Sequence, residues 1–412
     1  MSIVVLLGLL ALLLWLGVAL HPARPWDFHP VGDDNDLPTP PSVWPSVSIL
    51  VPARNESETL PQTLPALLRQ DYPGPFTVVV IDDRSHDGTA EVARQIAHSI
   101  GHTERLVVIS GAELPPGWVG KVWALEQGAL ACGVASSSTV NLQNSTPTPA
   151  PRYLLLTDAD IHHAQRSLRR LVAESEQETL GLNSRMARLR CRSFAEQLLI
   201  PPFVFFFNLL YPMRQVNDPC SSVAAAAGGC VLLSTSALRH AGGFACIKDR
   251  IIDDVSLATH IKHTGSAIRL ALSRTEVQSL RVYDSLAMIW VMVRRTAFTE
   301  LRYSWLRLVG SVLGLALMFV VPPVLTASGV GLWGASVVGM ASSPSIWGLV
   351  LASVGIGSWG LMAVVYAPAV RFYELPFVRV WMFPLAGMLY GAMTIDSALR
   401  YVLRMRIGWR DR

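Results

Sequence analysis

Acidic residues close two apolar segments that are typical of buried strands. Asp158 and Asp160 form a D-x-D at the end of YLLLTDAD, and Asp82 and Asp83 close FTVVVIDD. Alternate carboxylates at a strand end can face the same side and hold a hard divalent cation, Mg²⁺ or Mn²⁺, through oxygen ligands. Such an ion would neutralise charge that builds on a departing diphosphate. A solvated turn is the alternative for the D-x-D, but the apolar strand before it and the second carboxylate-ended strand favour a cation site.

Further residues that could bind a phosphate-bearing nucleotide follow other expected strands and turns. Glu56, in PARNESETL, lies in the turn after the first strand, where it could accept a hydrogen bond from a ribose or base. Asp83 is placed to accept from the nucleobase. Lys121 follows two glycines in GWVGKVWALEQG, so its ammonium is a candidate partner for the donor phosphates. A helix-capping turn for Glu56 and a solvated side chain for Lys121 are the structural alternatives.

An acidic pair, Asp253 and Asp254, begins the segment DDVSLATHIKHTG. Carboxylates commonly cap helix starts, but capping explains one acid more readily than two. Asp254 is therefore the candidate general base, and Asp253 would orient it or the helix. Upstream, Gly228 and Gly229 begin GGCVLLSTSALRHAGGF, and they would let the backbone approach a sugar or acceptor closely.

Alternating strands and helices are expected to position these residues. The expected strands are Val47–Pro52, Phe76–Asp83, Arg105–Ser110 and Tyr153–Asp160, and the expected helices are Glu58–Arg69, Thr89–Ile100 and Val122–Cys132. This alternation predicts an α/β fold with a doubly wound, mainly parallel sheet. Ligands bind beyond the carboxyl ends of such strands, so both carboxylate pairs should face one crevice. Ser136–Pro151 is expected to be a low-complexity surface insertion.

The composition places part of the chain in lipid, because 51% of its 412 residues are hydrophobic and only 16% are charged. Ile3–Leu20 carries no charge and is long enough to span, which predicts an N-terminal transmembrane anchor. A cleaved signal peptide is the alternative, although MSIVV lacks a basic region. At least two of three C-terminal runs should also span: Val309–Trp333, Ile346–Val370 and Val380–Leu399.

Two double prolines are expected to interrupt apolar helices. Pro322 and Pro323 favour a broken or re-entrant first C-terminal run, because proline removes a backbone donor. Leu198–Pro212 is intensely apolar but too short to span, and its own double proline should break a regular helix. It is predicted to be an interfacial element at the acceptor entrance, with a buried core helix as the alternative.

The distribution of basic residues predicts the orientation of the chain. Arg24 follows the uncharged first helix, which indicates an outside N-terminus and a cytoplasmic central domain. A basic C-terminal tail also favours the cytoplasm, so the number of crossings after the central domain should be even. Its arginines are Arg400, Arg404, Arg406, Arg410 and Arg412.

Other site classes find no support in the sequence. The five cysteines form no CxxC pair, which indicates neither a zinc site nor a full disulfide framework. His162 and His163 are expected in a loop, because no third ligand has zinc spacing. The net charge of +4 comes without a dense basic run, so nucleic acid is not an expected partner.

Five motifs in one order resemble glycosyltransferase family 2 with a GT-A fold, and more closely the hopene-associated glycosyltransferases of bacterial hopanoid gene clusters, with ceramide glucosyltransferases as relatives. They are VPARNE, VVVIDDRSHDGT, GWVGKVWALEQG, LTDADI and IIDDVSLA. The resemblance implies an inverting transfer from a nucleotide-diphosphate sugar, expected to be a UDP-sugar, to a lipid hydroxyl. It also implies Mg²⁺ or Mn²⁺ and a multi-pass protein of the bacterial inner membrane with a cytoplasmic catalytic domain.

The resemblance also assigns roles and boundaries. It implies that Asp160 is the chief metal contact, that Asp158 contacts the nucleotide, that Asp83 and Glu56 contact the nucleoside, and that Asp254 is the base. The expected segments are an anchor at 1–22, a linker at 23–45, a GT-A catalytic domain at 46–285, an interfacial helical segment at 286–308 and a transmembrane region at 309–412.

The chain departs from the family at its Q/R-x-x-R-W element. The nearest match, Thr299–Tyr303, keeps Arg302 in the acceptor or phosphate region but lacks the first polar residue and the tryptophan. This departure argues against a processive polysaccharide synthase, which is one alternative function. The other alternative is a non-catalytic membrane scaffold, whose expected loss of strand-end acids is not seen.

Overall fold

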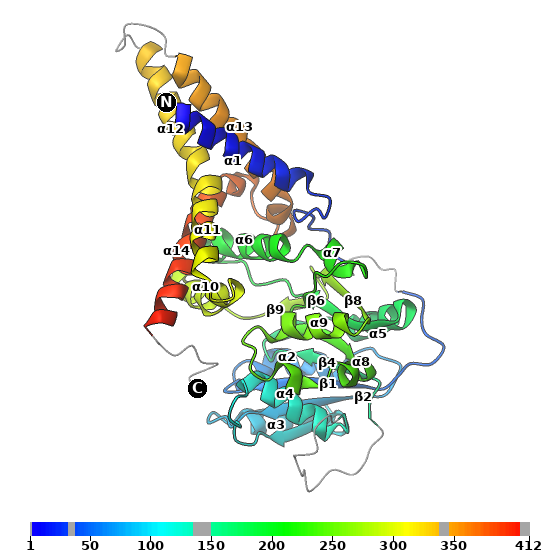
Figure 1. Cartoon of the computed structure of the whole chain (residues 1–412). Coiled ribbons are helices and arrows are strands. Elements are labelled where there is room, and N and C mark those ends of the chain that lie inside the picture. Colours follow the sequence, from blue (N-terminus) through cyan, green and yellow to red (C-terminus); the bar gives the residue numbers. More distant parts are fainter. Residues whose placement is uncertain (1, 32–37, 135–149, 338–345, 404–412) are drawn as a thin grey trace. The chain divides into compact units, whose positions relative to one another are not determined.

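The computed structural model describes residues 2–31, 38–134, 150–337 and 346–403, and it divides into two compact units (Figure 1). The sheet unit contains the described parts of His29–Arg190 and Met213–Val282. The helical unit contains the described parts of Met1–Phe28, Cys191–Pro212 and Tyr283–Ile407. Nearly all of the expected insertion, together with the last four arginines of the tail, lies outside the described residues.

The sheet unit is built on seven strands in the order β3-β2-β1-β4-β7-β6-β8. The strands are β1 Val47–Ala53, β2 Phe76–Asp82, β3 Leu106–Ser110, β4 Tyr153–Thr157, β6 Leu180–Met186, β7 Cys230–Ser234 and β8 Ala267–Leu272. Only β7 runs antiparallel to its neighbours in this described sheet, so the predicted mainly parallel α/β sheet is confirmed. A second, antiparallel sheet pairs β5 (Ile161–His163) with β9 (Val277–Ser279), which places the two histidines in a strand rather than the expected loop.

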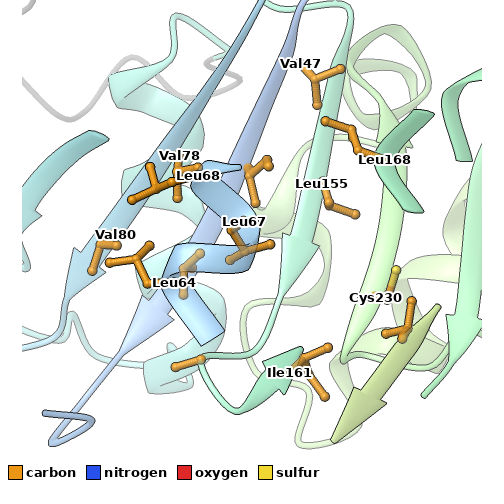
Figure 2. Close-up of a cluster of buried hydrophobic side chains, with 14 of the residues drawn as sticks. Val47, Leu64, Leu67, Leu68, Val78, Val80, Leu155, Ile161, Leu168 and Cys230 are labelled. Atoms are coloured by element: carbon orange, nitrogen blue, oxygen red, sulfur yellow. The ribbon is translucent and has the colours of Figure 1, made fainter. Parts of the chain in front are cut away.

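Helices cover both faces of the large sheet. They are α2 Leu60–Leu68, α3 Thr89–Ser99, α4 Gly120–Ala131, α5 Ser167–Glu178, α7 Met213–Asn217, α8 Thr235–His240 and α9 Asp253–His263, with short 3₁₀ turns η1 Thr103–Arg105 and η2 Phe244–Ile247. Leucines at helical spacing on α2 enter one core cluster with alternate residues of β1, β2 and β4 (Figure 2). On the other face, α4 packs so closely that a Cβ at Gly128 would lie 2.9 Å from Ile81 Cδ1 and 3.2 Å from Leu50 Cδ2.

The strand register brings the predicted acids to one sheet edge. Ala53 of β1 pairs with Asp82 of β2, and Leu50 of β1 pairs with Leu156 of β4. These strands are parallel, so their carboxyl ends coincide, and the residues that follow them face the same region.

The helical unit contains four stretches that are long and apolar enough to cross a membrane: Ile3–Leu20, Trp305–Val337, Ile346–Phe372 and Phe377–Val402. Its helices are α1 Ser2–Leu20, α6 Phe194–Leu210, α10 Leu286–Glu300, α11 Trp305–Leu315, α12 Val321–Val337, α13 Ile346–Phe372 and α14 Phe383–Val402. A π-helical turn, η3 Ala316–Val320, joins α11 to α12, and a 3₁₀ turn, η4 Phe377–Met382, precedes α14. The predicted anchor and C-terminal runs are therefore candidate spans.

The first double proline does not break its helix, because another helix supplies the missing hydrogen bond. Helical backbone continues from α11 through the π turn into α12 across Pro322 and Pro323. Neither proline has an N–H, so the Met318 carbonyl can be reached by neither an i+4 nor an i+5 donor. The indole Nε1 of Trp15, on α1, donates to this carbonyl at 3.0 Å. Trp15 is 1% exposed and packs edge-on against Phe319.

The second double proline is also accommodated, contrary to the expected break. Pro201 and Pro202 lie inside α6, which begins with a reciprocal capping box between Ser193 and Glu196. Adjacent prolines remove donors from only one turn, and the turns on either side are anchored by packing. Phe205 is buried against Phe383, with ring centroids 5.1 Å apart. The segment is thus a partly buried helix of the helical unit.

A polar cluster attaches α10 to α14. Trp290 Nε1 donates to Asp396 Oδ2 at 2.8 Å, and Arg294 Nη1 lies 3.6 Å from the same oxygen. The Ser397 hydroxyl accepts from the Phe298 N–H at 3.1 Å. Elsewhere on α10, Met288 is 43% and Val291 49% exposed, which suits an apolar surrounding.

Replacing Trp15 with Phe should destabilise the helical unit. The phenyl ring keeps most of the packing but leaves the Met318 carbonyl without its indole donor, so we expect a loss of about 1–3 kcal/mol. The midpoint of thermal unfolding in detergent checks this. Trp333→Phe is the control, because Trp333 is 43% exposed. Equal midpoints for the two variants would show that the indole hydrogen bond is dispensable.

Candidate functional site

The predicted acids of β4 and α9 meet at one lysine. Lys121 lies in the first turn of α4, and its Nζ is 2.7 Å from Asp158 Oδ1 and 3.7 Å from Asp253 Oδ2. Burial alone would lower the pKa of this ammonium, but the two carboxylates raise it above its ordinary value. Lys121 therefore stays charged and neutralises acids from two elements, which the sequence did not predict.

A pocket in the sheet unit surrounds this ion cluster. Its polar lining includes Lys121, Asp158, Asp253, Asp254 and the backbone of Gly228. Its apolar lining is Pro52, Leu125, Leu156, Val231, Phe244, Ile247 and Leu257. Charges set against apolar walls interact more strongly than in water, so a ligand's charge would be felt strongly here.

Asp254 is held by two backbone donors. Its Oδ2 accepts from the Gly228 N–H and its Oδ1 from the Val255 N–H, each at 2.8 Å. Burial and then Asp253 raise the pKa of Asp254 to about 6, although Lys121 and the two N–H groups oppose the shift. A carboxylate of this basicity suits a general base near neutral pH. The Val255 contact also retains part of the helix-start role, and the assignment as base stays a prediction.

Gly228 and Gly229 allow close packing around these groups. A Cβ at Gly228 would lie 3.1 Å from Asp254 Oδ2 and 3.2 Å from Lys121 Nζ. A Cβ at Gly229 would lie 3.0 Å from Ile161 Cδ1. Any larger residue at position 228 would press on the ion cluster, which explains the glycine better than turn geometry does.

Asp160 lies in a cluster of negative charge. Burial and then Asp158 raise its pKa to about 6; Arg281 opposes the shift, Glu56 adds to it, and Lys121 opposes it. Arg281 Nη1 is 3.7 Å from Asp160 Oδ2. Sequence reasoning missed Arg281, which lies in the segment after β9 and matches no motif.

The D-x-D suits a cation whose coordination shell is completed by substrate oxygens. Within 2–31, 38–134, 150–337 and 346–403, no group of three or more His, Cys, Asp or Glu side chains forms a ready-made metal site. Mg²⁺ is usually bound through one or two carboxylates plus substrate phosphates, however. The two D-x-D carboxylates, with excess negative charge around Asp160, fit that arrangement.

The turns after β1 and β2 hold the two candidate nucleoside contacts. The Asp83 side chain is fully buried, and Arg54 Nη1 lies 3.3 Å from its Oδ2. Glu56 is 8% exposed, and its backbone N–H donates to Thr89 Oγ1 at 2.9 Å. The Asn55 N–H donates to Ser85 Oγ at 2.9 Å, which ties the two turns together. The nucleoside roles of Asp83 and Glu56 stay predictions, and Arg54 is a neighbour that the sequence did not predict.

Arg302 lies in the helical unit, in the turn after α10. The Arg302 and Tyr303 N–H groups donate to the Thr299 and Phe298 carbonyls, which is the paired pattern of a Schellman helix end. Glycine is the usual residue where Arg302 stands with φ of 50°. Its proposed acceptor or phosphate role stays a prediction.

A mainly parallel sheet with acids gathered beyond its strand ends is typical of nucleotide-binding α/β domains. A sequence model of the family described as "Glycosyltransferase like family 2" matches residues 45–301. The match covers more than half of the chain, which therefore belongs to this family.

Two curated relatives match short stretches of the chain. Glycosyltransferase AglE of Haloferax volcanii is 39% identical over 67 residues, which are 16% of this chain and 22% of the relative. The 4,4'-diaponeurosporenoate glycosyltransferase of Staphylococcus haemolyticus is 33% identical over 84 residues, 20% of either chain. The chain thus spans about a fifth of the length of each relative. The expected closer kinship with hopene-associated and ceramide enzymes stays a prediction.

One solved structure shares the fold over nearly the whole chain. The mannosyltransferase PcManGT from Pyrobaculum calidifontis, in complex with GDP-Man and Mn²⁺, aligns with a TM-score of 0.50 and 17% identity. The alignment covers 98% of this chain and 100% of that one. At this identity, the similarity establishes the architecture.

The stability of the Asp254→Asn variant relative to wild type should increase as pH rises. The folded pKa of Asp254 lies near 6, above the unfolded value of about 4, so the native state binds the proton more tightly and loses stability as pH rises through that window. The melting temperature of Asp254→Asn minus that of wild type should therefore be higher at pH 7 than at pH 4.5, even though the amide loses one of the two backbone hydrogen bonds. Asp249→Asn, at a 65% exposed side chain, is the control. A difference that does not change with pH would contradict the raised pKa.

Proposed function

We propose that the chain is an inverting glycosyltransferase that moves a sugar from a nucleotide-diphosphate donor to a hydroxyl of a membrane lipid. The observation that carries this proposal is the gathering of Asp158, Asp253 and Asp254 around Lys121 in a domain of this family. Both curated relatives are named glycosyltransferases, and the solved mannosyltransferase holds GDP-Man and Mn²⁺. A UDP-sugar remains the expected donor.

On the donor side, Asp160 and Asp158 would hold Mg²⁺ or Mn²⁺, which when bound supplies positive charge next to the departing diphosphate. The Lys121 ammonium, now paired with Asp158, is within reach of the same region and can turn toward donor phosphates. Glu56 and Asp83 would bind the nucleoside, beyond the ends of β1 and β2.

On the acceptor side, Asp254 would take the proton of the acceptor hydroxyl as its oxygen bonds to the anomeric carbon. The bond from that carbon to the diphosphate oxygen breaks in the same step, so the configuration inverts. Asp253 shares the Lys121 ammonium and would orient this helix start. The Gly228 and Val255 N–H groups each use one lone pair of a different Asp254 oxygen, and the second lone pair of each oxygen remains for the proton.

The lipid acceptor is inferred from the helical unit. The described residues include four candidate spans in the same chain as the catalytic unit, and α10 exposes apolar side chains. We infer an acceptor of the hopanoid, other isoprenoid or sphingoid type, a bacterial inner-membrane location and a cytoplasmic catalytic unit. The Leu198–Pro212 segment is proposed to border the acceptor entrance, with Arg302, Gly228 and Gly229 in the acceptor or phosphate region.

Removing Asp160 should abolish the reaction. Purified wild-type protein with a membrane lipid extract and a panel of nucleotide sugars should release nucleoside diphosphate only when Mg²⁺ or Mn²⁺ is present. Asp160→Ala should release none, because the cation is then poorly held. Asp249→Ala, on the exposed surface, is the matched control. Full activity in excess chelator would rule out the metal assignment, and no release from any donor would rule out the transferase proposal.

Replacing Asp254 with Asn should lower turnover about 10²- to 10⁴-fold while donor affinity is kept, because a positioned base contributes a factor of this size. Asp253→Asn should cost less, since that residue only orients the helix start. Single-turnover transfer and nucleotide binding by calorimetry separate the two effects. Near-normal turnover in Asp254→Asn would return the acidic pair to a helix-start role.

A further inference from the structure

A buried chain of hydrogen bonds lies behind the D-x-D. Thr157, the last residue of β4, and His163, the last residue of β5, are each 1% exposed. The Thr157 hydroxyl lies 2.8 Å from His163 Nε2 and donates to the Gly229 carbonyl at 2.9 Å. These contacts join two strand ends to the glycine pair, and the functions assigned above use neither residue.

The direction of each bond follows from the atoms involved. A carbonyl only accepts, so the single hydroxyl proton of Thr157 is committed to Gly229 and His163 Nε2 must be the donor to Thr157. Nδ1 of His163 lies 3.3 Å from Ser167 Oγ, and it shares the single proton of that hydroxyl with Gln70 Oε1 as a second acceptor. Burial, with a smaller effect of His162, lowers the pKa of His163 to about 3, which is consistent with a neutral ring in one tautomer.

The outer end of this hydrogen-bond chain is anchored in the core. Ser167 Oγ lies 3.2 Å from Gln70 Oε1, and Gln70 Nε2 donates to the Ala164 carbonyl at 2.9 Å. Gln70 is 4% exposed. Because Ala164 directly follows His163, the amide fixes the backbone next to the ring as well as the ring's serine partner.

The inner end of the hydrogen-bond chain lies next to both halves of the candidate site. Thr157 directly precedes Asp158, which is paired with Lys121 at 2.7 Å. Gly229 follows Gly228, whose N–H donates to Asp254 Oδ2 at 2.8 Å. This hydroxyl thus adds a side-chain bond, next to the Thr157–Cys230 strand pairing, between the strand end that precedes the D-x-D and the peptide that holds the candidate base.

We propose that His163 and Thr157 are positioning residues for the transfer reaction, a role that rests on the function proposed above. His163 fixes the Thr157 hydroxyl toward Gly229, and this bond sets the position of the Gly228 N–H, and so of Asp254, relative to Asp158. Thr157 lines the pocket, but its hydroxyl is bonded to Gly229, and His163 is not among the lining residues. Small displacements of reacting groups lower rate strongly, so loss of this bond should act on kcat rather than on donor binding.

Two matched pairs of variants test the proposal. In His163→Gln the amide nitrogen can occupy the Nε2 position and donate to Thr157, whereas in His163→Asn it reaches only the Nδ1 position. Thr157→Ser keeps the hydroxyl, and Thr157→Val removes it at nearly constant shape. We expect kcat to fall about 10- to 100-fold in the Asn and Val variants, with donor KM within about twofold, and to recover largely in the Gln and Ser variants.

A double variant separates a shared role from two independent ones. Thr157→Val combined with His163→Asn should lose no more than the worse single variant, because both changes break the same chain. Losses that multiply, or a Gln variant as slow as the Asn variant, would overturn the proposal.

Amide hydrogen exchange gives a readout that does not need activity. The peptide containing Gly228 and Gly229 should exchange faster in the Asn and Val variants than in the Gln and Ser variants at equal melting temperature. If wild-type protein transfers no sugar, the proposed function fails while this comparison still decides whether the chain positions the glycine pair. Active wild type with equal rates and equal exchange in all four variants would overturn the positioning role alone.

Discussion

The candidate site depends on a partly buried ion cluster in which one ammonium faces a carboxylate that follows β4 and another at the start of α9. Asp158 and Asp253 belong to distant parts of the chain, and like charges confined near one pocket would repel each other without Lys121 between them. The lysine is placed by α4, whose close packing on Leu50 and Ile81 leaves room only for glycine at position 128. The packing of α4 on the sheet core therefore determines where the Lys121 ammonium lies. That ammonium allows Asp158 and Asp253 to lie close together.

Two charged groups of this cluster lie where local physical rules disfavour their charge. Lys121 lies in the first turn of α4, where the helix dipole disfavours a cation, and Asp254 is a carboxylate whose burial favours its neutral form. Such departures from local rules concentrate at functional sites. At the other end of α9, Lys262 donates to the Val216 and Val223 carbonyls at 2.7 Å each, so the helix that carries the acids is fixed at both ends.

Local pattern was enough to predict the elements that place the acids, and it failed where a distant partner changed the outcome. Apolar runs ending in carboxylates gave β2 and β4, because strand ends at a parallel sheet edge follow from sequence alone. The pairing of Lys121 with Asp158 could not be inferred, since it joins a helix start to a strand end through the fold. Three-residue strands such as β5 carry too little periodicity to be recognised, so His163 was expected in a loop. The double prolines did not break their helices, because the Trp15 indole donates to Met318 in one and side-chain packing holds the turns around Pro201 and Pro202 in the other.

The bond between Trp15 and the Met318 carbonyl also has a consequence for biogenesis. Its donor and acceptor are 303 residues apart, and α1 emerges from the ribosome long before the helix that it completes. At about 5–20 residues per second, that interval is roughly 15–60 s of synthesis. During this time the Trp15 indole has not yet met its acceptor. The later helices of the helical unit must therefore dock onto one that was synthesised much earlier, and the unit is completed late in synthesis.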